Sequence, residues 1–477
     1  MTIDSRIGSL AELPRALRDA VFGKLVARRR ASASPAEASI PHADRTGRLP
    51  VSLEQAFILR QQSRFGGRVA WTIAAPPLIL EDVDVEALRR AVAVLTRRHD
   101  ALHMTIEADG EGHRLRLDPG ALPPLTVTRL PLTAALTGLE AWIRKRYERM
   151  LALGFDPETG PLWRAELVSR GKRGVLLTSF CSLVADGEAL HLVAAELMEL
   201  YEAERGGASL AEPVSPRLDY ADYAAAQATD IRAGRFEGAL GWWRARLAGG
   251  PPVSWSTGAQ AREGAGSALL YEQVLSPRTG RALDAFAALH RTTPHVVLLT
   301  EFLRVLRRID GEDDLWVASA TTARDRAQTR AMVGSFARLM PLRLSWPDSG
   351  EPLDAVHAAL VETMDREPVP HLLLQDMLET AHPGASSAFR YIFNHRLVGE
   401  TPEEKETADV AFRPGPPHAE AAREEDILLM VLQSGERREL HWYLRADRFR
   451  PADAEEMLGD FLDVLRLRIS SPDFAAT

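Results

Sequence analysis

The chain has 477 residues and a formal net charge of −8, from 58 basic and 66 acidic side chains. Its hydrophobic (45%), charged (26%) and aromatic (6%) fractions are those of an ordinary globular protein, and its length suggests two or three domains. The acidic balance disfavours a nucleic-acid-binding protein with a broadly basic surface. The single cysteine, Cys181, excludes an internal disulfide and a cysteine-rich metal site. With no apolar stretch near ~18 residues and no signal-peptide pattern, we expect a cytoplasmic protein outside the membrane.

The first residues form a separate segment. A basic amphipathic helix is predicted over 10–30, and residues 1–30 hold seven basic and three acidic side chains. Residues 31–50 are rich in Ala, Ser and Pro without periodicity, which is typical of a linker. Two interpretations of residues 1–48 stay open: a docking element for an acidic partner, or an end of the chain that packs or frays.

From residue 51 onward, helical and strand patterns alternate. Asp84 precedes an amphipathic run and predicts a capped helix over 85–102. Further helices are expected at 51–64, 133–153, 187–204, most of 220–247, 281–290, 296–308 and 451–470. Strands are expected within 68–80 (ending at Pro76-Pro77), at 103–108, after 154–162, and at 175–181, 315–321, 340–346, 390–397, 426–435 and 439–447, with a hairpin at Ser434-Gly435. Residues 399–425 are polar, acidic and loop-like. The pattern favours two α/β lobes, at 49–228 and 229–477.

Several sequence motifs of known chemistry are absent. The chain has no GxSxG, so the nucleophile turn of α/β-hydrolases is missing. It also lacks the phosphate-binding GxxxxGK[ST] and GxGxxG loops and the metal-binding HExxH. His99 and His103 are four residues apart, but the expected helix ends between them and no third ligand is apparent. We expect neither a metal nor a tightly bound cofactor.

One strand-to-helix turn reads SFCSLVADGEAL, with Asp186 and Gly187 at the turn. An Asp there can accept hydrogen bonds from the first helical amides, and Gly allows a tight backbone. Further blocks precede and follow it in the chain: LPVSLEQAFIL, ALRRAVAVLTRRHDALHMTI, FDPETGPLWRAELV, ELMELYEA, DYADYAAAQ, LGWWRARLAG, LLTEFLRVLRRIDGEDDLWVASATTARDR and VGSFARLMPLRL. In this order and spacing they resemble the condensation domains of nonribosomal peptide synthetases, over about residues 49–470.

The resemblance implies an α/β fold of two chloramphenicol-acetyltransferase-like lobes arranged as a V around a central tunnel. It also implies partners: acyl or peptidyl carrier proteins that each deliver a phosphopantetheine arm, so that no cofactor is bound by the chain itself. Members of the family join a donor thioester to an acceptor amine or hydroxyl. Their HHxxxDG signature places its second His beside the reacting groups, where an imidazole can deprotonate or orient the acceptor.

This sequence departs from that signature. The motif is Cys181-Ser182-Leu183-Val184-Ala185-Asp186-Gly187, so both histidines are missing and Ser182 stands at the position of the catalytic imidazole. A lone Ser hydroxyl is not an appreciable base near neutral pH. His103 stands where the family usually has an Arg that often pairs with the motif Asp, so Asp186 has lost or exchanged that partner. Arg338 replaces an Asn that is common near the tunnel.

Each candidate site residue has a structural and a chemical interpretation. Cys181 is a nucleophile or a buried small residue, and Ser182 is an acyl acceptor or hydrogen-bond donor, or fills a former active-site pocket. Asp186 is expected to be structural, as a helix cap or ion-pair partner. His103 is a relocated base, a polar core residue or the partner of Asp186. The remaining candidates are Gly187 and Arg338 for substrate binding, Arg324 and Arg343 for phosphate contact or lobe-stabilising ion pairs, and His191 and His395 for structure or tunnel chemistry.

Two functions remain open. The first is a condensation-like protein that binds carrier-tethered intermediates of a nonribosomal peptide or hybrid polyketide pathway and recruits a tailoring enzyme or an adjacent synthase module. The alternative is an active amide- or ester-forming acyltransferase that uses a substitute base, substrate assistance or proximity alone. The chain starts at Met and shows no adenylation or carrier segment, so we expect its substrates to arrive on other proteins.

Overall fold

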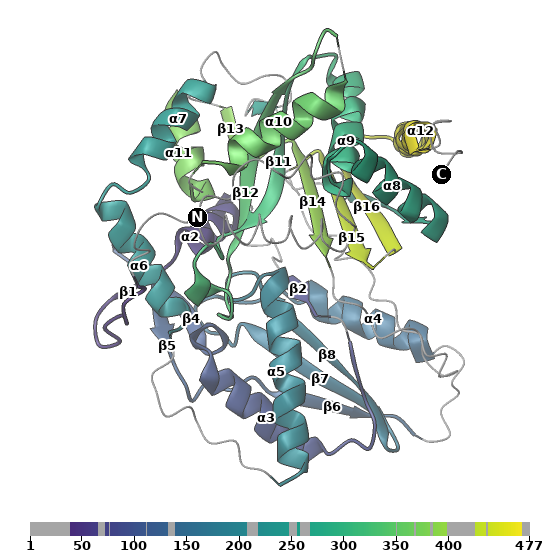
Figure 1. Ribbon diagram of the computed structural model, residues 1–477. Coiled ribbons are helices and arrows are strands. Elements are labelled where there is room, and N and C mark those ends of the chain that lie inside the picture. The colour runs from purple at the N-terminus through teal and green to yellow at the C-terminus, as the bar shows by residue number, and fades with distance from the viewer. Residues whose placement is uncertain are drawn as a thin grey trace, which may run out of the picture.

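A computed structural model describes residues 39–64, 72–75, 77–110, 112–131, 139–207, 218–247, 255–257, 268–349, 351–366, 369–381, 385–397, 425–435 and 437–469. The basic helix expected at 10–30 and nearly all of the acidic segment 399–425 lie outside these residues. The described elements gather into two α/β lobes, the first below and the second above in Figure 1.

The first lobe is built on a sheet with the strand order β2-β8-β7-β6, in which β3 also pairs with β8. The strands are β2 (Thr72–Ala74), β3 (Leu78–Leu80), β6 (Leu125–Arg129), β7 (Trp163–Arg170) and β8 (Arg173–Cys181). Alternate side chains of β7 and β8 pack against α3 (Val85–Arg98) and α5 (Gly187–Arg205). The opposite side chains, including Val168 and Leu177, pack against α4 (Leu139–Ala152). The period-two alternation of a strand thus gives both faces of this sheet an apolar layer.

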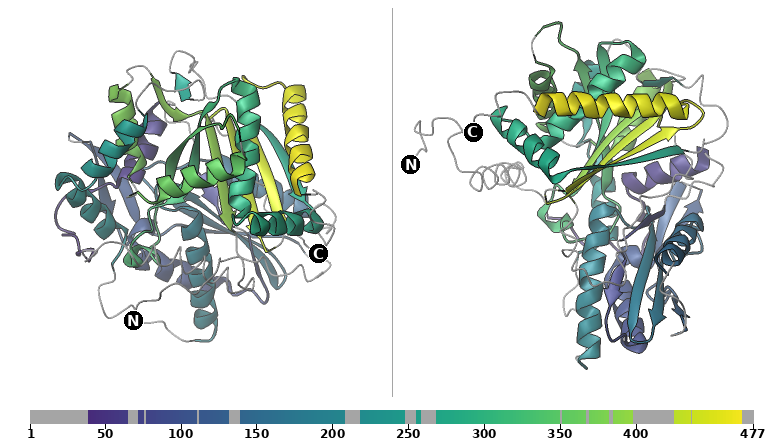
Figure 2. Two further views of the ribbon diagram at one scale, coloured as in Figure 1. Left: turned by 45° about the horizontal axis from the view of Figure 1, so that its top comes forward. Right: turned by 90° about the vertical axis from the view of Figure 1, so that its right-hand side faces the viewer.

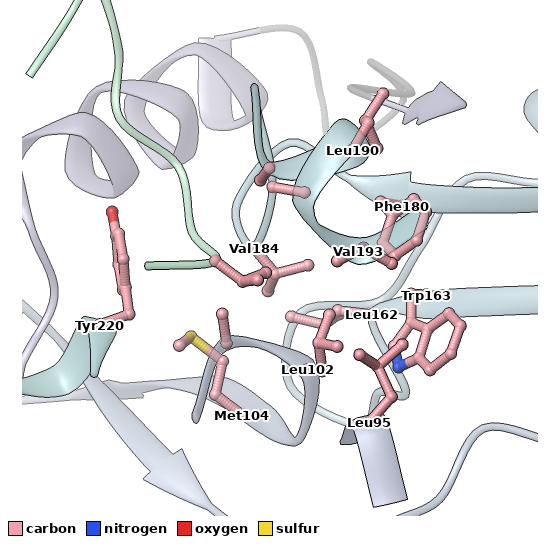
Figure 3. Close-up of a cluster of buried hydrophobic side chains, with 14 of the residues drawn as sticks. Leu95, Leu102, Met104, Leu162, Trp163, Phe180, Val184, Leu190, Val193 and Tyr220 are labelled. Atoms are coloured by element: carbon pink, nitrogen blue, oxygen red, sulfur yellow. The ribbon is translucent and has the colours of Figure 1, made fainter. Parts of the chain in front are cut away.

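Two smaller groups complete the first lobe. β1 (Leu49–Pro50), β5 (Gly112–Leu117) and β4 (Met104–Asp109) form a three-stranded sheet. α2 (Leu53–Arg64) and α6 (Tyr220–Arg232) flank it, and the latter leads towards the second lobe (Figure 1). The core lies between α3, α5 and the large sheet, where Leu95, Trp163 and Val193 meet (Figure 3).

The second lobe has a six-stranded sheet with the order β10-β16-β15-β14-β11-β12. The strands are β10 (Ala268–Leu275), β11 (Asp314–Thr322), β12 (Ala337–Ser345), β14 (Tyr391–Leu397), β15 (Ile427–Ser434) and β16 (Arg437–Arg445). One face is covered by α8 (Pro277–Leu289), α9 (Pro294–Asp310), α10 (Pro352–Met364) and α12 (Pro451–Ile469), the last of which runs across the top in Figure 2, right. α7 (Glu237–Leu247), α11 (His371–Ala381) and the pair β9 (Trp255–Thr257) and β13 (Ala385–Phe389) complete it.

The lobes are interlocked by a segment of the second half of the chain. Between β11 and β12, Ala323, Met332, Val333 and Phe336 enter the core of the first lobe. The Tyr220 hydroxyl bonds to the Ser335 carbonyl oxygen at 2.6 Å and lies 2.8 Å from the Ser52 hydroxyl. The relative placement of the lobes therefore depends on buried contacts within one core.

Most elements expected from the sequence are confirmed. Asp84 caps α3 by accepting from the Ala87 amide at 2.9 Å, and the hairpin of β15 and β16 turns at Ser434-Gly435. The strand expected within 68–80 is instead two short strands, β2 and β3, and Pro77 directly precedes β3, where a proline that cannot donate to a ladder is tolerated. The elements not expected from the sequence include β5, β6, β10, α10 and α11.

Candidate functional site

The motif turn joins β8 to α5 and is anchored from both sides. Its apolar residues Leu183, Val184 and Ala185 are at most 1% exposed, and Val184 points into the first core beside Met104 (Figure 3). Gln55 on α2 donates its side-chain amide to the Leu183 carbonyl oxygen at 2.9 Å. The turn is therefore held as a fixed part of the core.

Asp186 is the structural centre of the motif. Its carboxylate accepts hydrogen bonds from the Ala189 amide at 2.8 Å, which caps α5, and from the Phe336 amide at 3.1 Å. Arg324, from the interlocking segment, donates to the same carboxylate at 3.1 Å. The structural interpretation of Asp186 is thus supported twice, as a cap and as an ion-pair partner.

The Arg324 guanidinium makes its contacts with other protein groups. Besides Asp186, its guanidinium donates to the carbonyl oxygens of Thr329 (2.8 Å) and Met332 (2.6 Å), and it lies over the Phe336 ring at 4.2 Å. The residue is 3% exposed. Of its two interpretations from sequence, a lobe-stabilising ion pair is the one that these contacts support.

Cys181 and Ser182, which stand where the family motif has its two histidines, are not activated as nucleophiles. Cys181 is 2% exposed, and burial raises the pKa of its thiol to about 11, so it is protonated near neutral pH. Ser182 is half-buried, and no described side chain hydrogen-bonds to its hydroxyl. A serine nucleophile needs a base within hydrogen-bond reach. Within the described part of the chain, neither residue has one.

His103 does not pair with Asp186. Its Nδ1 lies 2.8 Å from the Thr96 carbonyl oxygen, and its Nε2 is 3.8 Å from an Asp100 carboxylate oxygen. The residue is 5% exposed, which fits a polar residue of the core. His99, four residues earlier, hydrogen-bonds to the Glu196 carboxylate at 2.7 Å.

Arg338 belongs to a buried polar network between the lobes. Its Nε donates to Glu54 on α2 at 2.7 Å, and its Nη2 donates to the Tyr223 hydroxyl at 3.2 Å. Gln227 donates to the same carboxylate at 3.0 Å. Burial and the neighbouring Glu54 carboxylate raise the pKa of Tyr223. Sequence reasoning missed Glu54, because nothing local marks it as the partner of a residue so far along the chain.

Gly187 lies at the motif turn, in contact with the second lobe. It is the first residue of α5 and is not among the described residues with positive φ, so a special backbone conformation does not require it. Instead, the Arg396 guanidinium of β14 fills the space that a β-carbon on residue 187 would occupy. A β-carbon at residue 187 would therefore displace the end of the Arg396 side chain, which reaches the turn from the other lobe.

His191 lies one turn after Gly187 on α5 and is exposed. Partial desolvation and the positive charge of Arg396 lower its pKa, so its imidazole is neutral near pH 7. His395 lies on the opposite face of β14 from Arg396 and stacks on His295 with ring centroids 5.6 Å apart. Burial lowers the pKa of His395 to about 4, which fits a neutral structural residue.

The described residues contain no group of three or more His, Cys, Asp or Glu side chains that could hold a metal ion. Among the helices that the structure describes, none is long and apolar enough to cross a membrane. The arrangement offers a turn packed between two lobes, a Ser182 hydroxyl for which the described residues supply no base, and the His191 imidazole and Arg396 guanidinium near Gly187. The motif residues Cys181–Gly187 include no histidine.

Comparisons with known proteins agree with the fold. The Condensation domain family matches residues 46–475. The chain is 30% identical over 396 residues to phosphinothricin tripeptide synthetase PhsC of Streptomyces viridochromogenes, covering 79% of this chain and 35% of that one. It is 29% identical over 346 residues to chondramide synthase cmdD of Chondromyces crocatus, covering 69% of this chain and 8% of the synthase. It thus spans only a minor part of each of these relatives.

Solved structures show the same architecture. SgcC5 from Streptomyces globisporus superposes with a TM-score of 0.72 at 20% identity, covering 89% of this chain and 99% of that one. The X-domain from teicoplanin biosynthesis, which has also been solved in complex with OxyB, gives a TM-score of 0.72 at 20% identity and covers 91% of this chain and 98% of its own. With the motif turn, the two lobes and the match across residues 46–475, the chain belongs to the condensation domain family, which is also represented in peptide synthetases such as PhsC.

Proposed function

We propose that this protein binds carrier-tethered phosphopantetheinyl intermediates between its lobes without His-based condensation, and acts as an interface or recruitment domain for a tailoring enzyme or an adjacent synthase module. The observation that carries the proposal is that the motif keeps its structural residues but lacks its catalytic histidines. The Asp186–Arg324 pair that holds the turn is complete, whereas the two residues at the histidine positions are a neutral buried thiol and a hydroxyl that has no base within reach among the described residues.

Loss of a general base typically costs about 10²–10⁴-fold in rate. Binding does not carry that cost, because it depends on the lobes and on the surfaces that meet the carrier proteins. The complex of the X-domain and OxyB from teicoplanin biosynthesis is an example of a protein of this fold that binds a separate protein. That example supports recruitment of a partner protein as a function that this fold can perform.

A second candidate is an active acyltransferase, and His191 is the observation that favours it. Its imidazole is exposed and neutral near pH 7 and lies one helical turn from the motif Gly187. In such a reaction the acceptor nitrogen or oxygen would attack the thioester carbon and form a C–N or C–O bond. The C–S bond would break, His191 would take the acceptor proton, and the pantetheine thiolate would leave and be protonated.

Intact-protein mass spectrometry separates the two functions. The assay uses the carrier proteins whose genes lie nearest to the gene of this protein, one loaded with the donor and one with the acceptor. They are incubated with the wild type, Ser182→Ala, Ser182→His and His191→Gln. We expect no condensed product with the wild type and product with Ser182→His, which restores an imidazole at the motif. Product with the wild type that His191→Gln abolishes would overturn the recruitment function and establish the acyltransferase.

A further inference from the structure

Arg396 is a cation without a described counter-ion. It projects from β14 towards the first lobe, and its guanidinium contacts Gly187 at the start of α5. Within the described residues no carboxylate forms an ion pair with it and no acceptor forms a hydrogen bond with it. Arg396 is half-buried, and a guanidinium that lies against another element is usually paired, so this placement requires an explanation.

Nearby charges do not supply a partner. Asp186 is close enough to interact electrostatically, but its carboxylate already accepts from Arg324 and from two backbone amides. The first turn of a helix is also the positive end of its dipole, which makes the position less favourable for a cation. Burial lowers the pKa of Arg396, so its charge is under-solvated where it lies.

The surroundings of Arg396 are polar on one side and apolar on the other. Asn394 lies on the same face of β14, and the cross-strand neighbours of these two residues are Met430 and Leu432. Leu428, Met430 and Tyr443 form an apolar cluster on that face of the sheet. An ion pair beside such a cluster is screened less than one at the surface.

We propose that Arg396 is an anion-binding residue that selects a carrier-bound acyl group ending in a carboxylate. The inference rests on the proposed function, since the acyl group reaches the interlobe region on a pantetheine arm. An entering carboxylate would accept from the guanidinium and supply the missing counter-charge beside Gly187. A cationic acyl group would be repelled by both Arg396 and the helix end.

The test measures binding of three pantetheine thioesters of matched chain length by isothermal titration calorimetry. Succinyl-pantetheine ends in a carboxylate, butyryl-pantetheine in a methyl group and 4-aminobutyryl-pantetheine in an ammonium group. We expect succinyl-pantetheine to bind about tenfold more tightly than butyryl-pantetheine, as for a charge-assisted hydrogen bond, and the ammonium compound to bind most weakly.

Two variants should remove this preference by independent routes. Arg396→Gln removes the charge, and Gly187→Ala displaces the guanidinium by placing a β-carbon in its space. The exposed Arg450→Gln serves as the matched control and should keep the preference. Each variant's affinity for butyryl-pantetheine reports whether its binding region is intact.

The outcomes distinguish the two proposals. Equal affinities of succinyl- and butyryl-pantetheine for the wild type would overturn the anion site and leave carrier-arm binding standing. A preference that survives in Arg396→Gln would also overturn it. Failure of all three thioesters to bind would contradict the proposed function itself, and the anion site with it.

Discussion

Replacement of Arg324 by Met should destabilise the protein strongly, because the guanidinium joins the lobes at the motif. The side chains of Arg324 and Asp186 are 2% and 5% exposed. The change removes the ion pair at 3.1 Å and the donors to the carbonyl oxygens of Thr329 and Met332, while Met keeps most of the aliphatic volume. Breaking a buried pair by removing one partner typically costs about 3–5 kcal/mol. We expect the free energy of unfolding to fall by that amount.

Urea titration followed by far-UV circular dichroism measures this change. The control is Arg450→Met, which removes an exposed ion pair with Asp453 at 2.7 Å and should change the stability by less than ~0.5 kcal/mol. A loss below about 1 kcal/mol for Arg324→Met would refute the reasoning, because the Asp186 carboxylate would then be satisfied without its arginine.

Three further predictions concern buried groups. Cys181 should resist iodoacetamide at pH 8 in the folded protein and react fully in urea, because burial raises its pKa to about 11; rapid labelling of the folded protein would contradict this. Burial lowers the pKa of His371 to about 4, so the unfolded chain binds a proton between pH 6.5 and 4 that the folded chain does not, and stability falls as the pH drops through that window. Between pH 4 and 6.5, His371→Phe should reduce the slope of the unfolding free energy against pH by about 1.4 kcal/mol per pH unit. An unchanged slope would contradict the assignment of this proton uptake to His371. Gly334→Ala should lower the melting temperature more than Gly187→Ala, because its β-carbon would meet the rigid Tyr220 ring whereas residue 187 faces the end of a flexible arginine; equal shifts in differential scanning calorimetry would disprove this.

The local elements of the fold could be predicted because their signals are local. Asp84 and Asp186 precede apolar runs of helical period, and both cap helices as expected. The motif turn could be found for the same reason, and the blocks around it indicated the family. Short or proline-interrupted strands, such as β2 and β3, were less visible because two or three residues carry little periodicity.

The contacts of the site could not be predicted, because they join residues far apart in sequence. Arg324 was identified, but its pairing with Asp186 depends on how the segment after β11 enters the first core. No local sequence motif marks Arg396 as a site residue. The alternation of side chains along β14 predicts only that it lies on the opposite face of the strand from His395. Its contact with Gly187 arises from the placement of one lobe on the other, which no local pattern encodes.

The central claim is that the lobes bind a phosphopantetheine arm although the motif lacks its histidines. The most direct measurement is the affinity of this protein for a carrier protein with and without its phosphopantetheine arm, compared by isothermal titration calorimetry. The account predicts tighter binding of the form that bears the arm. Equal affinities for the two forms would contradict it, because the carrier surface alone would then account for the interaction.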